Sequence, residues 1–338
     1  MIRRVLAVGL TVLALGSAAT AAQATGDDPL PLPGFGDLVV DDAQERVFVS
    51  GGSSSNSVVV VDEHGRLKKK IDNQFGATGL VLSEDGKTLY VAQAAGDAIS
   101  AVDTTTFAEK ARYATGARTC PTHLARTGTV VWFGYGCEDE WSGGVGKLDV
   151  AAATPVSLDE QGDVLFQSAP LVTSAGTTVV ASQLITSLTS VHVYQAGSDG
   201  KLEPGASGDV AGGNLTDVAL SPDGTSAYTA SGSRTQVQGF ATVDLSGRGS
   251  YSTGPYPNAV AASPTTQHIA TGAYTTRNKA VTVFPLGGTV PVKSYDLDGS
   301  VLANRGLAWS ADAKRLYAVL QGPADSRPRL EVFSRPLS

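Results

Sequence analysis

The sequence predicts an all-β protein, and two observations support this prediction. The chain of 338 residues combines 42% apolar residues with 39 glycines and only 7% aromatic residues, a composition typical of short strands joined by many turns. In addition, one short segment recurs along the chain. Its clearest copies are GLVLSEDGKTLYVA from Gly79, DVALSPDGTSAYTA from Asp217 and GLAWSADAKRLYAV from Gly306.

Four weaker copies complete a set of seven repeats. They begin at Asp37, Thr122, Ala169 and Ala259, so that successive copies start about 42 to 48 residues apart. This period is expected of the four-stranded blades of a β-propeller. We therefore predict a seven-bladed β-propeller with four-stranded blades.

The pattern inside each repeat predicts the order of strands in a blade. A short apolar strand leads to a turn such as Asp85-Gly86 or Asp223-Gly224, whose residues supply the side-chain capping and the positive φ of a tight hairpin. A second apolar strand follows, then a third such as SVVVVD, and a polar fourth such as RLKKKID. A polar strand suits the outer edge of a blade, because its charges discourage pairing with other chains.

The seventh copy stops after its third strand, at RLEVFS. The segment from Asp28 to Leu32 precedes the first copy, where a fourth strand would lie. We therefore predict that this N-terminal segment supplies the outer strand of the last blade and closes the ring, since an outermost strand tolerates proline. No change of composition separates the copies, so residues 25–338 are expected to form a single domain.

The N-terminus has the pattern of a secretory signal peptide over residues 1–24. Arg3 and Arg4 precede an apolar run from Val5 to Leu15, and Ala22-Gln23-Ala24 is an A-x-A cleavage site. General secretion is favoured over twin-arginine export. The apolar run is too short for a membrane anchor and no later segment is long enough to cross a bilayer, so we expect a secreted, extracellular protein.

The charge of the chain argues against nucleic acid as a partner. The formal net charge is −7, and loss of the signal peptide, which contains two arginines and no acidic residue, makes it more negative. Binding to phosphate backbones needs a basic surface. The expected partner is instead an unidentified protein or a small polar ligand. We expect a monomer without a cofactor.

The repeat resembles that of a known family. LSEDGKTLYVA and LSPDGTSAYTA are similar to the YVTN-type propeller repeats of secreted bacterial proteins, including actinobacterial ones, and SVHVYQAGSDGKLEP resembles the lactonase-type seven-bladed propellers. The resemblance covers nearly all of the mature chain. It implies the seven-bladed fold, but because its motifs are turns and core strands it implies no particular activity.

Alignment of the seven repeats places polar residues from distant parts of the chain around the channel mouth. The residues at or next to the start of each inner strand form one predicted ring: Asp37, His123, Asp217, Asn258 and Arg305. Two carboxylates and an imidazole could hold a divalent cation or polarise a ligand. Alternatively, these side chains line a water-filled channel and bond to backbone. No aligned glutamate joins them, which distinguishes the ring from that of the metal-dependent gluconolactonase propellers.

Both cysteines fall in the third repeat, in the segment RTCPTHLARTGTVVWFGYGCEDEW. Metal binding and a thiol nucleophile are alternatives for this segment, but two cysteines in an exported chain most simply form a disulfide. Cys120 and Cys137 lie opposite each other across the predicted hairpin, so we predict a bond between them. This bond would fix a loop of four candidate ligand-binding residues: Glu138, Asp139, Glu140 and Trp141.

The sequence leaves three functions open. The favoured one is a non-catalytic module that binds through the loops around the channel. The second is a lactonase- or hydrolase-like enzyme with a site around His123, Asp37 and Asp217. The third is a structural module of the cell surface. The nucleophile elbow Gly-x-Ser-x-Gly, the phosphate loop, His-Glu-x-x-His and Cys-x-x-Cys are all missing from the sequence.

Overall fold

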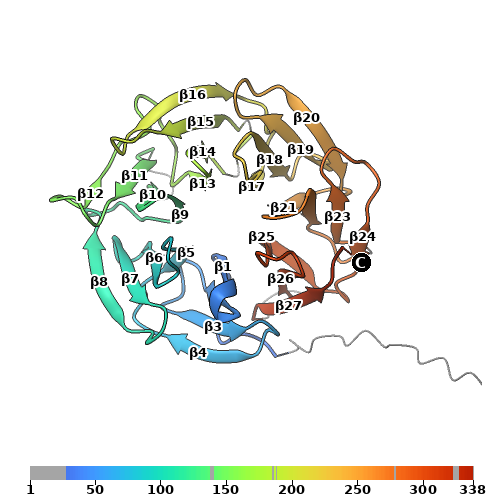
Figure 1. Ribbon diagram of the computed structural model, residues 1–338, viewed down its shortest axis with the longest axis horizontal. Helices are drawn as coiled ribbons and strands as arrows, with labels where there is room; N and C mark the ends of the chain where they lie inside the picture. Colours follow the sequence, from blue (N-terminus) through green and yellow to red (C-terminus); the bar gives the residue numbers. More distant parts are fainter. Residues whose placement is uncertain are drawn as a thin grey trace, which may run out of the picture.

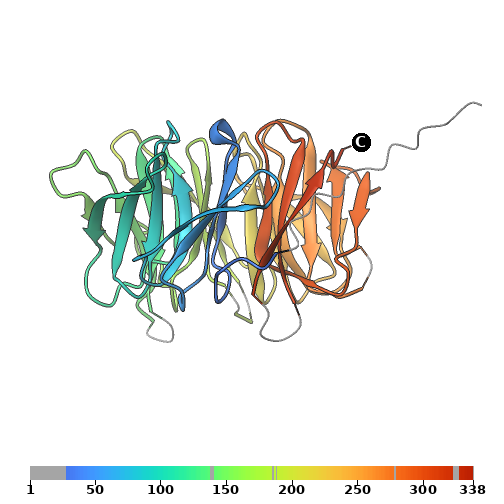
Figure 2. The same cartoon turned by 90° about the horizontal axis from the view of Figure 1, so that it is seen from below.

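Seven antiparallel β-sheets stand in a ring around a common axis in the computed structural model (Figure 1). The structure describes residues 28–137, 141–184, 186–187, 189–277, 279–322 and 327–337. The predicted signal peptide, residues 1–24, lies outside these residues. Seen from the side, the ring is a flat disc with loops on both faces (Figure 2). The prediction of an all-β, seven-bladed propeller is confirmed.

Each blade consists of consecutive strands ordered from the axis to the rim. The innermost strands are β1 (Leu38–Asp41), β5 (Ala77–Leu82), β9 (His123–Thr127), β13 (Leu171–Ala175), β17 (Leu215–Leu220), β21 (Pro257–Ala262) and β25 (Val301–Trp309). The second strands are β2 (Arg46–Ser50), β6 (Thr88–Gln93), β10 (Val130–Tyr135), β14 (Thr178–Ser182), β18 (Ser226–Ser231), β22 (His268–Ala273) and β26 (Arg315–Gln321).

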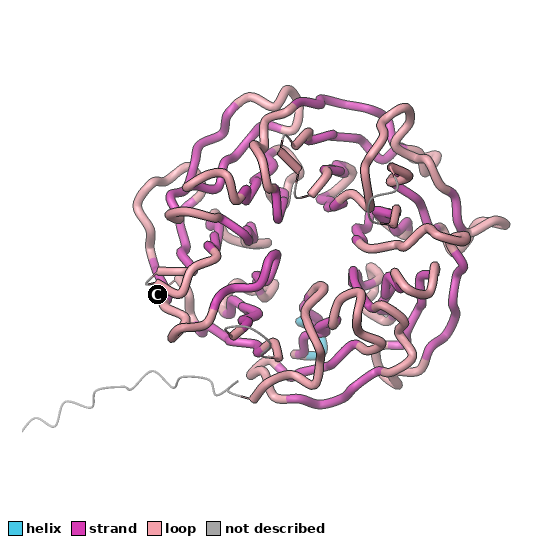
Figure 3. Tube along the Cα trace, turned by 180° about the vertical axis from the view of Figure 1, so that it is seen from behind, coloured by secondary structure: helices cyan, strands magenta, loops and turns pink. Residues whose placement is uncertain are grey.

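The two outer layers complete the blades. The third strands are β3 (Val58–Asp62), β7 (Ala98–Asp103), β11 (Gly144–Leu148), β15 (Val191–Ala196), β19 (Gln236–Ala241), β23 (Val281–Pro285) and β27 (Arg329–Ser334). The fourth strands are β4 (Leu67–Ile71), β8 (Glu109–Ala114), β12 (Val156–Ser157), β16 (Leu202–Gly208), β20 (Gly247–Ser252) and β24 (Lys293–Tyr295). A short 3-10 helix, η1 (Asp42–Gln44), joins β1 to β2 and is the helical segment coloured in Figure 3.

The turn between first and second strands has the chemistry predicted from the repeat. In blade 2, Oδ1 of Asp85 accepts hydrogen bonds from Oγ of Ser83 at 2.7 Å and from the backbone N–H of Lys87 at 3.0 Å. Gly86 has a φ of 68°, a left-handed conformation that glycine adopts at low cost. Side-chain capping and positive φ therefore act together to fix the hairpin.

The predicted outer strand of the seventh blade is not formed. Among the described residues this blade has three strands, in the order β25-β26-β27, although Leu30 of the N-terminal segment donates its N–H to Pro328 O at 2.8 Å. The prolines of this segment have no N–H to extend a ladder. Instead, Leu30 and Leu32 are buried in the apolar cluster that joins blade 7 to blade 1. Apolar burial and one backbone hydrogen bond, without a paired strand, attach this segment to the last blade.

Two kinds of connection lie on the face that carries the predicted ring. They are the links from one blade to the next and the loops between second and third strands. Their backbones bond to each other: in the β2–β3 loop, Gly52 donates its N–H to Ala77 O, at the start of β5, at 2.8 Å. We call this face the loop face.

Candidate functional site

Arg305 connects three blades at the channel mouth. Its Nη1 lies 2.9 Å from Nδ1 of His123, and its Nη2 lies 3.3 Å from Oδ1 of Asp37. His123 begins β9 in blade 3, and Asp37 immediately precedes β1 in blade 1. The structure thus brings together three of the five residues that the repeat alignment placed in one ring, and the charges of Arg305 and Asp37 also act on a fourth, Asp217. We call these four residues the Arg305 cluster.

A local irregularity of β25 positions Arg305. The pairing of β25 with β26 shifts register between Leu302 and Leu307, and Arg305 within this bulge has a φ of 62°. A bulge bends its strand and redirects the side chain at that point. The guanidinium can therefore reach residues of other blades.

The two aspartates of the ring clamp neighbouring blades together. Oδ2 of Asp37 accepts the backbone N–H of Leu80 on β5 at 3.0 Å, and Oδ2 of Asp217 accepts that of Val260 on β21 at 2.8 Å. Both aspartates occupy the same repeat position, and each reaches the inner strand of the next blade. Because buried N–H groups need acceptors, each carboxylate stabilises the contact between its own blade and the next.

Burial controls protonation in this cluster. Desolvation, together with the charge of Arg305, holds the pKa of His123 well below its usual value, so the imidazole is neutral at pH 7. Because arginine only donates, Nδ1 of His123 is the unprotonated acceptor. Burial also raises the pKa of Asp37, against the opposing charge of Arg305 and backbone hydrogen bonds.

Asp217 is the member of the cluster that titrates near neutral pH. Burial raises the pKa of its carboxyl to about 7, although Arg305 and the N–H groups of Val260 and Val218 oppose this rise. The charge of Asp37 adds to it. The cluster therefore contains a guanidinium, a neutral imidazole and a carboxyl whose charge changes around pH 7.

Asn258, the fifth predicted ring residue, has other partners. Its Nδ2 donates to Leu302 O at 2.8 Å and lies 3.3 Å from Oδ1 of Asn304. These bonds connect β21 of blade 6 to β25 of blade 7. The contacts of this amide are therefore with the neighbouring blade, outside the Arg305 cluster.

A cavity of about 350 Å³ occupies the channel beside the cluster, with Asp37, Asp217 and Arg305 on its wall. In the part of the chain that the structure describes, no group of three or more His, Cys, Asp or Glu side chains could hold a metal ion. The positively charged guanidinium of Arg305 already contacts Asp37 and His123, the residues that would have to bind a divalent cation. Because like charges repel, the guanidinium disfavours a cation at this position. The geometry does not favour a cation there.

Cys120 and Cys137 form the predicted disulfide. Their Cα atoms are 5.1 Å apart and their sulfur atoms 1.95 Å apart. The bond ties the link that precedes β9 to the loop that follows β10. This loop contains Glu138, Asp139 and Glu140, which lie outside the described residues.

Trp141, the last residue of the predicted loop, is described and is exposed over 68% of its surface. Its backbone N–H donates to Gln167 O, in the link between β12 and β13, at 3.0 Å. Its φ of 50° is in the left-handed region, which is uncommon for a bulky side chain. A backbone hydrogen bond to the β12–β13 link thus holds this exposed tryptophan.

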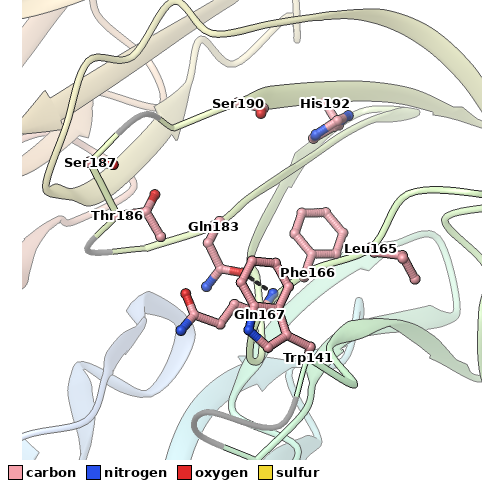
Figure 4. Close-up of a pocket in the computed structure, with 9 residues that line it drawn as sticks. All are labelled: Trp141, Leu165, Phe166, Gln167, Gln183, Thr186, Ser187, Ser190 and His192. Atoms are coloured by element: carbon pink, nitrogen blue, oxygen red, sulfur yellow. Dashed lines mark hydrogen bonds between the residues drawn. The ribbon is translucent and has the colours of Figure 1, made fainter.

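Trp141 stands at the rim of a cavity of about 440 Å³ between blades 3 and 4 (Figure 4). The β10–β11 loop, the β12–β13 link, the β14–β15 loop and β15 supply its lining residues: Trp141, Leu165, Phe166, Gln167, Gln183, Thr186, Ser187, Ser190 and His192. We call this cavity the blade 3–4 pocket. Phe166 is buried, and the edge of its ring meets the His192 ring at a centroid distance of 5.6 Å.

Sequence reasoning predicted one residue of this pocket, Trp141, and missed the others. Leu165, Phe166 and Gln167 lie in a link that has no repeat motif. An available signal was spacing: the copies at Thr122 and Ala169 start about five residues further apart than those at Asp37 and Gly79. Additional residues in a loop of a regular repeat often mark a functional face.

No protein-family model and no curated protein matches the chain. Solved structures do. A chain of the mitotic checkpoint complex superimposes with a TM-score of 0.70 at 16% identity over 98% of both chains. Hydrazine synthase of Kuenenia stuttgartiensis gives a TM-score of 0.68 at 15% identity, over 92% of this chain and 98% of that chain.

A third similar structure is the β-propeller domain of Cps50 (Swd1) from Myceliophteria thermophila. It gives a TM-score of 0.67 at 13% identity, over 91% of this chain and 99% of that domain. At such low identities these three likenesses establish the propeller fold alone, and function must be argued from the sites of this chain.

Proposed function

We propose that the protein is a secreted propeller of the YVTN-like type that binds a polar ligand or partner through its loop face, without catalysis. The observation that carries the proposal is the blade 3–4 pocket with the exposed Trp141 at its rim. Small-molecule sites are concave, lined by aromatic and apolar groups, and contain a few polar groups that fix orientation. This pocket has that composition.

The way Trp141 is held supports a binding role. The hydrogen bond from Trp141 N to Gln167 O fixes the backbone at Trp141 before any ligand arrives. A preorganised residue loses less conformational entropy on binding, which increases affinity. Among the similar structures, one chain belongs to a mitotic checkpoint complex, in which a propeller is part of an assembly.

The channel supports catalysis less well. In the hydrolase hypothesis His123 acts beside Asp37 and Asp217, yet Nδ1 of His123 is engaged by Arg305. Both carboxylates accept backbone N–H groups of the next blade. A general base must reach the proton that it removes, and these groups are instead committed to one another and to the backbone.

Two features support export. The sequence pattern of residues 1–24 is that of a signal peptide, and the disulfide suits an oxidising compartment. Among the described residues, the structure contains no helix with the length and apolar character of a membrane span. We propose that the exported chain works as a monomer.

An array of immobilised proteins, peptides and saccharides tests the binding function. The mature chain is compared with Trp141→Ala and with Tyr274→Ala, which removes a half-exposed aromatic from the β22–β23 loop of the same face. We expect the array to contain ligands that bind the wild type and Tyr274→Ala but do not bind Trp141→Ala. The same preparation is incubated with lactones and esters. Hydrolysis that His123→Ala abolishes, with no ligand dependent on Trp141, would establish the enzyme instead.

A further inference from the structure

The blade 3–4 pocket has no formally charged side chain among its described lining residues. Eight are apolar, amide or hydroxyl residues, and the ninth is His192. Burial lowers the pKa of this imidazole, against the opposing charge of Asp209, so that it is neutral at pH 7. Among the described lining residues an anionic ligand group would find no cationic side chain, and the Asp209 carboxylate, which accepts a hydrogen bond from Ser190, would repel it. The described walls therefore disfavour an anionic ligand group.

One side of the pocket is apolar. Trp141 and Leu165 are exposed at the rim, at 68% and 79% of their surfaces, and Phe166 forms the buried part of that side. Large apolar groups at the surface of a soluble protein often mark a binding surface. The faces of aromatic rings pack against apolar groups of a ligand.

Polar residues that line the same cavity offer both donors and acceptors. Oε1 of Gln183 accepts the backbone N–H of Gln167 at 2.7 Å, and its Nε2 donates to Oγ of Ser168 at 3.1 Å (Figure 4 shows the first bond). An amide nitrogen carries two hydrogens, so the Gln183 amide can donate a second bond. The bonds that it already makes fix its orientation toward the pocket.

Two further groups add acceptors. Oγ of Ser190 donates to Oδ1 of Asp209 at 2.8 Å, which leaves the oxygen lone pairs of the serine able to accept. A neutral His192 has one donor and one acceptor nitrogen. A ligand that fits must therefore combine an apolar face with groups that both donate and accept hydrogen bonds.

We infer that the blade 3–4 pocket binds an uncharged saccharide; this inference rests on the proposed binding function. A sugar ring has a face of C–H groups that can pack on Trp141, and its hydroxyl groups both donate and accept hydrogen bonds. The cavity of about 440 Å³ is within the size range of small-molecule sites, roughly 300–1,000 Å³. It can hold a short saccharide, with Gln183, Ser190 and His192 as the polar contacts.

The test combines calorimetric titration with tryptophan fluorescence. The probes are neutral oligosaccharides of glucose, mannose, galactose and N-acetylglucosamine, a uronate oligosaccharide as the charged counterpart, and an uncharged Gly-Ser peptide. Trp132 and Trp309 are buried, whereas Trp141 is exposed. A shift in the solvent-exposed part of the emission therefore reports on Trp141.

We expect at least one neutral oligosaccharide to give saturable heat and a blue shift of emission. Its affinity should change by less than twofold between about 50 and 500 mM salt, because no ion pair forms. Trp141→Ala should weaken it about tenfold or more, as truncation of a central aromatic commonly does. Trp141→Phe should retain part of the affinity, and Tyr274→Ala all of it.

Other results would overturn the saccharide assignment. If only the uronate or the peptide binds in a Trp141-dependent way, the pocket recognises a different chemistry, while the proposed binding function stands. If no probe perturbs Trp141, the saccharide assignment fails, and the array of proteins and peptides decides the binding function separately. Equal binding to the wild type and to Trp141→Ala would place the saccharide elsewhere on the molecule.

Discussion

Arg305 donates a hydrogen bond to His123 across the channel mouth, although 182 positions separate the two residues in the sequence. The same guanidinium pairs with Asp37. Blades 1, 3 and 7 are therefore connected through one side chain, on the axis side of the ring.

Arg305→Met should destabilise the fold by about 3 kcal/mol, because it leaves the buried carboxylate of Asp37 without its cation. Urea denaturation at pH 7.5 measures the change. In a double-mutant cycle, Asp37→Asn should cost less in the Arg305→Met background than in the wild type. Additive effects would show that the pair does not contribute to stability.

Asp217→Asn should change how stability depends on pH. The folded pKa of Asp217, about 7, lies above the unfolded value of 3.8, so the folded protein binds the additional proton between these values. The stabilisation from Asp217 is therefore complete below pH 4 and is lost as the pH rises through 7. The unfolding free energy of the variant minus that of the wild type should therefore increase from pH 4 to pH 8, by roughly 4 kcal/mol at most.

The contribution of His123 to stability depends on pH in the opposite sense to that of Asp217. Its folded pKa lies well below 6.5, so its contribution to stability is lost as the pH falls below about 6.5. In the wild type, the stability gained as Asp217 binds its proton at falling pH partly offsets the stability lost at His123. The Asp217→Asn variant has no such gain. The slope of unfolding free energy against pH should therefore be more positive between pH 4 and 6.5 than in the wild type. Parallel curves for both proteins would contradict the assigned pKa of Asp217.

Removal of the disulfide with Cys120→Ser and Cys137→Ser should lower the unfolding free energy by about 3 kcal/mol, because a loop closed over a sequence separation of 17 restricts the unfolded chain. Denaturation with and without reductant measures this. The wild type should lose stability in reductant and the double variant should not respond.

Trp141→Phe should remove the part of the fluorescence that solvent can reach. Trp132 is fully buried and Trp309 is 6% exposed, so the remaining emission should shift to shorter wavelength and resist acrylamide quenching. The free energy of unfolding should change by less than about 0.5 kcal/mol, as expected for an exposed position. An unchanged quenching constant would mean that Trp141 is not accessible in solution.

Leu32→Ala should destabilise the protein by roughly 2–5 kcal/mol, because its side chain is 1% exposed in the cluster between blades 7 and 1. Leu165→Ala is the matched control, since that leucine is 79% exposed. The control should stay within about 0.5 kcal/mol of the wild type. Similar midpoints for the two variants in urea would show that the N-terminal segment contributes little to ring closure.

The sequence predicts most of the fold because each repeat contains the residues that determine its own turns and strands. Asp85 and Gly86 determine their turn by capping and backbone conformation, and the same pattern returns in later blades. The outer strand of blade 7 was predicted wrongly. Alignment of the repeats shows where a fourth strand could lie, but it does not show whether the segment pairs with β27 or buries its apolar side chains instead. The prolines of this segment have no N–H groups to extend a ladder, whereas burial of Leu30 and Leu32 removes apolar surface from water.

The candidate site could be predicted in part. Repeat alignment brought Asp37, His123 and Arg305 together because the inner strands of all blades share one geometry. It could not predict that Arg305 would reach both partners, since the bulge in β25 interrupts the regular repeat on which the alignment depends. The blade 3–4 pocket depends on an irregular link around Phe166, and a segment without periodicity gives no positional information.

The clamps formed by Asp37 and Asp217 have an evolutionary consequence. A substitution that alters the charge of the channel also loosens the attachment of one blade to the next, because the same carboxylates serve both purposes. Specificity in the channel is therefore difficult to diversify. Trp141 and Leu165 are exposed at the rim, so substitutions there should change ligand binding without disturbing the attachment between blades.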